Sequence, residues 1–163
     1  MKTTKVRKLL PDTWGFVCPV HTPDGGLCGL LNHLSIGCKI LCNQVEYGSV
    51  SKLTRLCSGL GMLALDSNIP QTIPSNCIPV VLDGKVLGFV DPLLAEDLAD
   101  KLREYKVMET EESVHKYTSI TFIPPSPFPK TTQYPGVWLY TELARPLRKV
   151  INLIHNKFEW LDP

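Results

Sequence analysis

The sequence lacks the motifs on which most enzymes depend. Its 163 residues contain no Walker phosphate loop, no serine–histidine–aspartate arrangement and no carboxylate cluster with the spacing of phosphoryl-transfer metal sites. No apolar run approaches the ~20 residues that cross a membrane, and no signal peptide follows Met1. We therefore expect a chain without catalytic residues of its own and without a membrane partner.

The zinc-ribbon spacing C-x-x-C is also missing, although the chain has six cysteines. Nine residues separate Cys18 from Cys28, and His21 and His33 could add ligands on paper. A stand-alone zinc-binding or protein-interaction module is therefore one hypothesis. The other is a set of reduced, packed thiols, and the spacing favours it. On this second interpretation the chain holds no metal and no cofactor.

Charge is nearly balanced overall, at a net +1, but it is not balanced along the chain. Residues 1–62 hold 7 Lys and Arg against 3 Asp and Glu, residues 63–112 hold 4 against 10, and residues 113–163 hold 6 against 3. The acidic middle argues against a continuous nucleic-acid contact there. It is more typical of a surface that faces solvent or another protein.

Proline and glycine are concentrated between residues 7 and 34, which we call the signature loop. Both residue types fix unusual backbone shapes, and Thr22-Pro23-Asp24-Gly25 predicts a tight turn with a positive φ at Gly25. Lys2, Lys5, Arg7 and Lys8 stand at its start. Basic residues beside a rigid loop suit a nearby phosphate backbone, although a solvated tail would have the same composition.

The signature loop resembles a known family motif. Its order from Trp14 to Leu34, W-G-x-x-C-P-x-x-T-P-D-G-x-x-C-G-L-x-x-x-L, is similar to that of the second-largest subunit of multisubunit DNA-directed RNA polymerases. The fuller run from Arg7 to His33 resembles the RNA polymerase I branch of that family. Relatives in the other branches have a carboxylate where this chain has His21. The resemblance continues more weakly through Val80–Lys85 and Leu139–Val150.

The resemblance implies a position for the loop in the assembled enzyme. The equivalent bacterial loop forms part of the wall behind the active centre, beside the start of the RNA–DNA hybrid, where rifampicin binds. By position, five residues would line that wall: Pro19, His21, Thr22, Pro23 and Asp24. Together with Arg7 and Lys8, they form the predicted nucleic-acid-proximal set. Trp14 could stack on a base, but packing against its own domain is the favoured interpretation.

The resemblance also implies partners and a cellular location. It implies that the chain is an internal fragment of the second-largest subunit of RNA polymerase I. That polymerase makes the precursor of ribosomal RNA in the nucleolus of the nucleus. The expected partners are the largest subunit, the other polymerase subunits, template DNA and RNA. The magnesium and zinc of the enzyme are expected elsewhere, and the isolated fragment is expected to be inactive.

Patterns along the rest of the chain predict an α+β fold. Asp83-Gly84, between two apolar runs, predicts a hairpin of Ile78–Leu82 with Lys85–Val90. Two helices are expected, one capped by Ser49 and running to about Leu60, the other capped by Asp91 and running to about Tyr105. Further strands are predicted at Ser35–Cys42, Tyr117–Ile123, Gly136–Thr141 and Leu147–Val150.

These elements predict three segments. Residues 1–34 would be the end of a fork-like segment that carries the signature loop. Residues 35–150 would form a mixed sheet and hairpin with two helices, which the resemblance likens to the "external-2" domain of the subunit. Residues 151–163, which show no clear period, would be a tail. The proline-rich Pro124–Pro129 is predicted to be a loop spacer rather than a ligand for an SH3 domain.

Overall fold

The computed structural model describes residues 7–29, 32–42, 47–65, 75–108, 114–125 and 134–163, except for the side chains of 47–49. The chain divides into two compact units, one from residues 1–42 with 143–163 and the other from residues 43–142. These bounds differ from the three predicted segments, since the first unit is built from both ends of the chain. Most of the proline-rich segment, from residue 126, lies outside the described residues.

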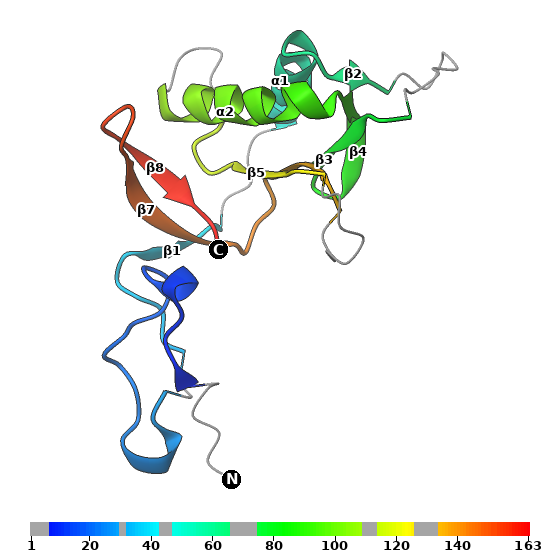
Figure 1. The fold of residues 1–163 in the computed structure, drawn as a ribbon. Helices are drawn as coiled ribbons and strands as arrows, with labels where there is room; N and C mark the ends of the chain where they lie inside the picture. The colour runs from blue at the N-terminus through cyan, green and yellow to red at the C-terminus, as the bar shows by residue number, and fades with distance from the viewer. Residues whose placement is uncertain (1–6, 30–31, 43–46, 66–74, 109–113, 126–133) are drawn as a thin grey trace. The chain divides into compact units, whose positions relative to one another are not determined.

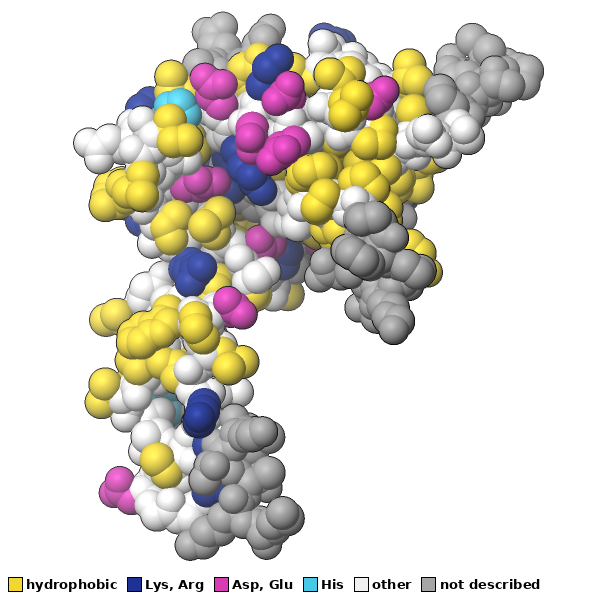
Figure 2. All heavy atoms as spheres, in the orientation of Figure 1, with side chains coloured by type: hydrophobic (Ala, Val, Ile, Leu, Met, Phe, Trp, Pro, Cys, Tyr) yellow, Lys and Arg dark blue, Asp and Glu magenta, His cyan; other side chains and the backbone are white. Residues whose placement is uncertain are grey.

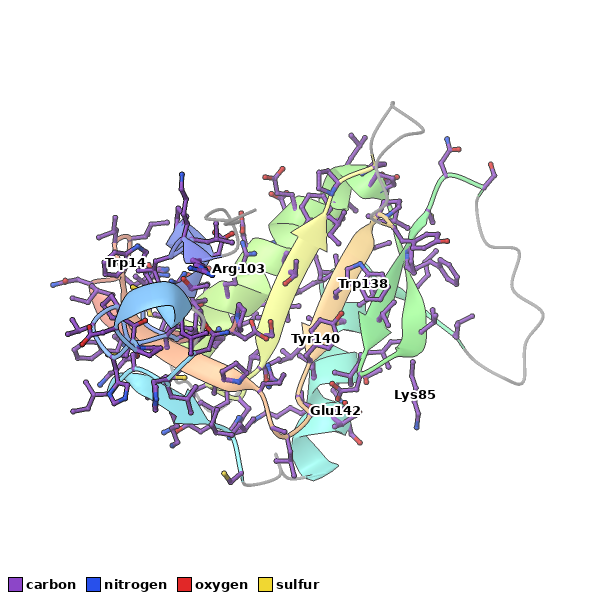
Figure 3. The ribbon with its side chains drawn as sticks, turned by 90° about the horizontal axis from the view of Figure 1, so that it is seen from below. Trp14, Lys85, Arg103, Trp138, Tyr140 and Glu142 are labelled. Atoms are coloured by element: carbon purple, nitrogen blue, oxygen red, sulfur yellow. The ribbon has the colours of Figure 1, made fainter. Side chains whose placement is uncertain are left out.

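The unit of residues 43–142 contains a five-stranded sheet. Its strands are β2 (Leu63–Ala64), β3 (Ile78–Leu82), β4 (Lys85–Val90), β5 (Ser119–Ile123) and β6 (Gly136–Tyr140), in the order β2-β4-β3-β6-β5. The β3–β6 pair is parallel and the other pairs are antiparallel. Helices α1 (Tyr47–Gly59) and α2 (Pro92–Met108) lie over one face of this sheet (Figures 1 and 3).

The core lies between that face and the two helices. Alternate residues of each strand point into it, as the two-residue period of a strand requires. Val80 and Val137 come from the central strands, and Leu98 and Leu102 come from α2; all four are almost completely buried. The other face of the sheet carries Trp138 and Tyr140, which alternate with the core residues of β6 (Figure 3).

The predicted hairpin is confirmed. Strands β3 and β4 pair from Ile78↔Val90 to Leu82↔Lys85, and Asp83 and Gly84 have φ of 47° and 83°. Positive φ at both central residues is the requirement of a type I′ turn. Tertiary contacts hold this turn as well, because the Asp83 carboxylate accepts hydrogen bonds from the backbone N–H and the hydroxyl of Thr141.

The helices are where predicted, with different ends. The backbone N–H of Leu93 donates to the Asp91 carboxylate at 2.9 Å, so the predicted cap of α2 is confirmed. The helix continues three residues beyond Tyr105, because Lys106 and Val107 are buried in the same unit. Helix α1 begins at Tyr47, so the prediction that Ser49 caps it is wrong. A cap preference of about 1 kcal/mol is a weak constraint on where a helix starts.

The unit made from the two chain ends contains a three-stranded antiparallel sheet. Strand β1 (Cys38–Ile40) pairs with β7 (Pro146–Asn152), which pairs with β8 (Lys157–Leu161). Strand β1 is shorter than the predicted Ser35–Cys42, and β7 is longer than the predicted Leu147–Val150. Strand β8 lies within residues 151–163, the segment interpreted as a tail because its apolar residues show no clear period.

The turn between β7 and β8 explains why strand β8 was not predicted from the sequence. The Asn152 side-chain oxygen accepts hydrogen bonds from the backbone N–H groups of Ile154 and His155, and Asn156 takes a φ of 51°. This is a side-chain-directed turn without the Asn-Gly or Asp-Gly pair that marks a two-residue hairpin. The α+β prediction is confirmed. Of the helices in the described residues, neither has the length and apolar character needed to cross a membrane.

The β3–β4 turn generates the first prediction. Gly84→Ala should lower the free energy of unfolding by about 1 kcal/mol or more, because a side chain is strained at this positive φ although nothing lies within 4 Å of the added methyl. Gly84→Val should cost more, because a β-branched residue fits that region less well.

Gly59→Ala is the matched control, because Gly59 also has open space around it but lies within α1. There alanine should be neutral or stabilising. The measurement is urea unfolding of the three variants, and equal effects of the two alanine substitutions would contradict the turn assignment.

Candidate functional site

The signature loop is closed at its base by backbone hydrogen bonds. The N–H of Cys18 donates to the carbonyl of His33 at 2.8 Å, and the N–H of Ser35 donates to the carbonyl of Phe16 at 2.9 Å. The two ends of the segment 18–33 are therefore held next to each other. Such a closure fixes the ends of a loop whose own residues form little regular structure.

Strand β7 holds the base of the loop through one side chain. The guanidinium of Arg148 donates to the carbonyl of Trp14 and lies 5.0 Å from the centroid of the Phe16 ring. Phe16 is buried, whereas the Trp14 side chain is 55% exposed. The interpretation of Trp14 as the packed anchor is therefore wrong: its carbonyl is the anchor, and the buried ring belongs to Phe16.

The tip of the loop folds back through Thr22 and Gly29. The N–H of Gly29 donates to the Thr22 hydroxyl at 2.6 Å. Gly29 has a φ of 78°, and an added Cβ would lie 2.5 Å from the carbonyl oxygen of Arg7. Only glycine permits that approach, so the basic residue at the start of the loop is held against the tip.

The turn predicted at Thr22–Gly25 lies further along the chain. Asp24 would be the third residue of the predicted turn, but it is extended, with φ −75° and ψ 159°, whereas the third residue of a type I or type II turn has ψ near 0°. The chain instead turns through a 3-10 segment at Gly25–Leu27, where the N–H of Cys28 donates to the carbonyl of Gly25. The positive φ predicted for Gly25 is confirmed at 77°.

These contacts surround a pocket of about 210 Å³. Of the predicted nucleic-acid-proximal set, Arg7, Lys8, Pro19 and Thr22 line it together. The other residues that line the pocket were not predicted from the sequence, because the polar ones carry no charge and the apolar ones resemble core residues. They are Leu9, Thr13, Val17, Cys18, Cys28, Gly29 and Asn32. The Nε of Arg7 is buried and has no hydrogen-bond partner.

The remaining predicted residues lie outside this pocket. His21 is exposed, with its ring centroid 3.7 Å from that of His33, and it borders a shallower hollow with Cys18, Val20 and Thr22. Pro23 is half-buried and Asp24 is exposed, and neither lines the pocket. Lys2 and Lys5 lie outside the described residues.

The thiols of the chain differ in their acidity. The backbone N–H groups of His21 and, to a smaller extent, Val20 hold the pKa of the Cys18 thiol below its usual range, because they stabilise the thiolate. Burial in the core raises the pKa of the Cys57 thiol to about 12. All six cysteines are free thiols. Within the described ranges, no group of three or more His, Cys, Asp or Glu side chains could hold a metal ion.

Comparison with known proteins identifies relatives of both units. Residues 1–40 match the family model "RNA polymerase Rpb2, domain 3", and residues 87–148 match "RNA polymerase I, Rpa2 specific domain". The chain is 44% identical over 159 residues to DNA-directed RNA polymerase I subunit RPA2 of Pongo abelii, covering 98% of the chain and 13% of that relative.

Two other relatives carry the same name. The Mus musculus protein is 45% identical over 153 residues, covering 94% of the chain and 13% of the relative. The Euplotoides octocarinatus protein is 38% identical over 164 residues, covering 99% of the chain and 14% of the relative. The chain thus spans 13 or 14% of the length of these curated relatives.

The thiol environments predict an order of reactivity. The rate of Cys18 alkylation by iodoacetamide should reach its midpoint at a lower pH in the folded chain than in urea, because the thiolate is the nucleophile and folding lowers its pKa. Cys57 should remain unmodified until the chain unfolds. Mass spectrometry of the modified peptides over a pH series measures both. A Cys18 midpoint unaffected by urea would contradict the assigned environment.

Proposed function

Because the chain belongs to the family of second-largest RNA polymerase I subunits, we propose that it acts as one segment of such a subunit in DNA-templated RNA synthesis. In this proposal the chain contributes a preformed loop to the enzyme and no residue that takes part in the chemical step. The observation that carries this proposal is the closed signature loop, which brings Arg7, Lys8, Pro19 and Thr22 around one pocket.

The chemistry of the pocket suits nucleic acid. Arg7 and Lys8 supply positive charge, and a guanidinium and an ammonium are the groups that donate hydrogen bonds to phosphate oxygens. His21 is exposed beside the pocket and offers a ring and a donor to a base or a ribose. In this proposal the loop lies along the wall behind the active centre, and phosphoryl transfer itself depends on groups outside this chain.

The unit of residues 43–142 has a different proposed role. Its surface over helix α2 gathers Asp and Glu side chains (Figure 2). Among the exposed acidic residues of α2, Asp100 pairs with Arg103 at 3.1 Å. Such a surface repels a phosphate backbone. We assign this unit to the outer, external-2-like part of the subunit, and the signature loop to the end of its fork-like segment.

The assembled enzyme supplies the remaining parts of the proposal. The proposed partners are the largest RNA polymerase I subunit, the other polymerase subunits, template DNA and the RNA product, in the nucleus and its nucleolus. Magnesium and zinc would be held elsewhere in the enzyme. The alternative, a stand-alone zinc or protein-interaction module, would show one zinc per purified chain by elemental analysis.

The first functional prediction concerns the isolated chain. It should not polymerise nucleotides on a template, because phosphoryl transfer requires metal ions and basic groups aligned with the reacting phosphates. A primer-extension assay with the purified chain, magnesium and all four nucleotides is the measurement. Template-dependent RNA synthesis under these conditions would overturn the proposal that this chain contributes only a loop.

The second functional prediction concerns His21. His21→Ala should leave the melting temperature of the chain unchanged within about one degree, because an exposed side chain contributes little to folding. It should slow elongation by RNA polymerase I reconstituted with the corresponding change. Ile36→Ala, which alters a fully exposed side chain outside the loop, should change neither measurement.

A His21→Ala chain that melts several degrees lower would mean that its contact with the His33 ring is structural. Its assignment to the nucleic-acid side of the loop would then be wrong.

A further inference from the structure

The three-stranded sheet has one face that the proposed function does not use. Lys39 is opposite Leu147, Lys149 is opposite Trp160, and Ile151 is opposite Phe158. Because side chains alternate along a strand, these residues project from the same face. We call Lys39, Lys149, Phe158 and Trp160 the lysine–aromatic face.

The opposite face of this sheet is already occupied. It carries Arg148, whose side chain contacts Trp14 and Phe16 at the base of the signature loop. It also carries Glu159, which is buried and accepts a hydrogen bond from the Asn152 amide at 3.1 Å. A ligand would therefore have access to this sheet from the lysine–aromatic face.

Along β7, exposure on that face increases toward the β7–β8 turn. Leu147, nearest β1, is buried, whereas Lys149 is exposed and Phe158 is 63% exposed. Large apolar side chains at the turn are more exposed still, and Figure 2 shows hydrophobic side chains at the surface over the β7–β8 hairpin. Exposure of a large part of an aromatic ring to water is unfavourable in free energy, and a bound partner that covers the ring would remove this cost.

Each aromatic ring on this face has a lysine beside it. The Lys149 ammonium lies 3.8 Å from the centroid of the Phe158 ring, and the Lys39 ammonium lies 5.7 Å from the centroid of the Trp160 ring. Of the two carboxylates nearest these rings along the chain, Glu159 is on the other side of the sheet, and the charge of Asp162 is balanced by Arg145 at 3.0 Å. The face therefore combines two aromatic rings with an excess of positive charge.

We propose that the lysine–aromatic face binds single-stranded nucleic acid, as a site separate from the signature loop. Phe158 and Trp160 are two residues apart on β8, so their Cα atoms are separated by about 7 Å along the strand. An extended single strand separates successive bases by a similar distance. One base can then stack on each ring, while Lys149 and Lys39 contact the phosphates.

The lysines do not compete effectively with bases for the rings. An exposed cation–aromatic contact changes an equilibrium constant about two- to fivefold. Stacking of a base on an aromatic side chain changes it about five- to 150-fold. A base therefore displaces the ammonium from the Phe158 ring, and the released Lys149 gains a phosphate partner. Duplex DNA cannot bind in this way, because its base faces are already stacked.

The test measures fluorescence anisotropy of short labelled oligo(dT) and oligo(U) at low salt, with a duplex of equal length as the comparison. The chain should bind both single strands more tightly than the duplex, and the ratio between them shows whether RNA or DNA is preferred. Phe158→Leu should weaken binding about fivefold or more, because it keeps an apolar side chain but removes the ring face. Phe158→Tyr should bind as the parent chain does.

Substitution of Lys149 tests the phosphate contact independently of the rings. Lys149→Gln should reduce the slope of log affinity against log salt by about 0.7, the contribution of one phosphate contact to a single strand, and Lys149→Arg should restore it. Melting curves show whether each variant is folded. Lys85→Gln, which alters an exposed lysine on β4 in the other unit, should leave these oligonucleotide affinities unchanged. Lys8→Gln is measured alongside it, to show whether the signature loop also contacts the strands.

Three outcomes would overturn the proposal. The first is a folded Phe158→Leu chain that binds oligo(dT) and oligo(U) as tightly as the parent. The second is a duplex that binds as tightly as either single strand. The third is a loss of binding in Lys8→Gln but not in Lys149→Gln, which would move the contact to the signature loop and leave the proposed function intact.

Discussion

The pairing of β1 with β7 is the constraint on which the rest of the structure depends. It joins residues 38–40 to residues 146–148, more than a hundred positions apart in the chain. Backbone hydrogen bonds extend this closure, from the N–H of Leu41 to the carbonyl of Arg145 and from the N–H of Ala144 to the carbonyl of Leu41. The unit of residues 43–142 is thereby an insertion whose two ends are held together.

That closure is thermodynamically reasonable because the insertion has a hydrophobic core of its own. The entropy cost of closing a loop rises only slowly with its length, by about 0.6 kcal/mol for each doubling. The inserted unit has its own sheet, two helices and a buried core, so contacts within that unit order the intervening chain. The same closure positions Arg148, and through it the base of the signature loop.

Pre-organisation of the signature loop comes from backbone contacts rather than from a hydrophobic core. Hydrogen bonds of Cys18, Gly29 and Ser35 close it, and few of its side chains are buried. A loop built in this way presents its side chains outward in a fixed arrangement. Because the contacting groups are already held in place, less ordering entropy is lost when a ligand binds.

The sequence by itself determined the elements whose signals are local. The β3–β4 hairpin followed from Asp83-Gly84, the start of α2 followed from Asp91-Pro92, and the identity of the signature loop followed from its order of residues. Each depends on backbone preferences that act over a few positions. The sequence also led to four residues of the pocket, Arg7, Lys8, Pro19 and Thr22, because charge and loop composition are visible without a structure.

Only the tertiary structure decided which distant residues meet. Strand β8 was missed because its turn is directed by the Asn152 side chain, and β2 was missed because two residues carry too little pattern. The exposure of Trp14, the approach of Arg7 to Gly29 and the alignment of Lys39, Lys149, Phe158 and Trp160 on one face all follow from strand register and loop closure. Those are non-local contacts, and no short stretch of sequence specifies them.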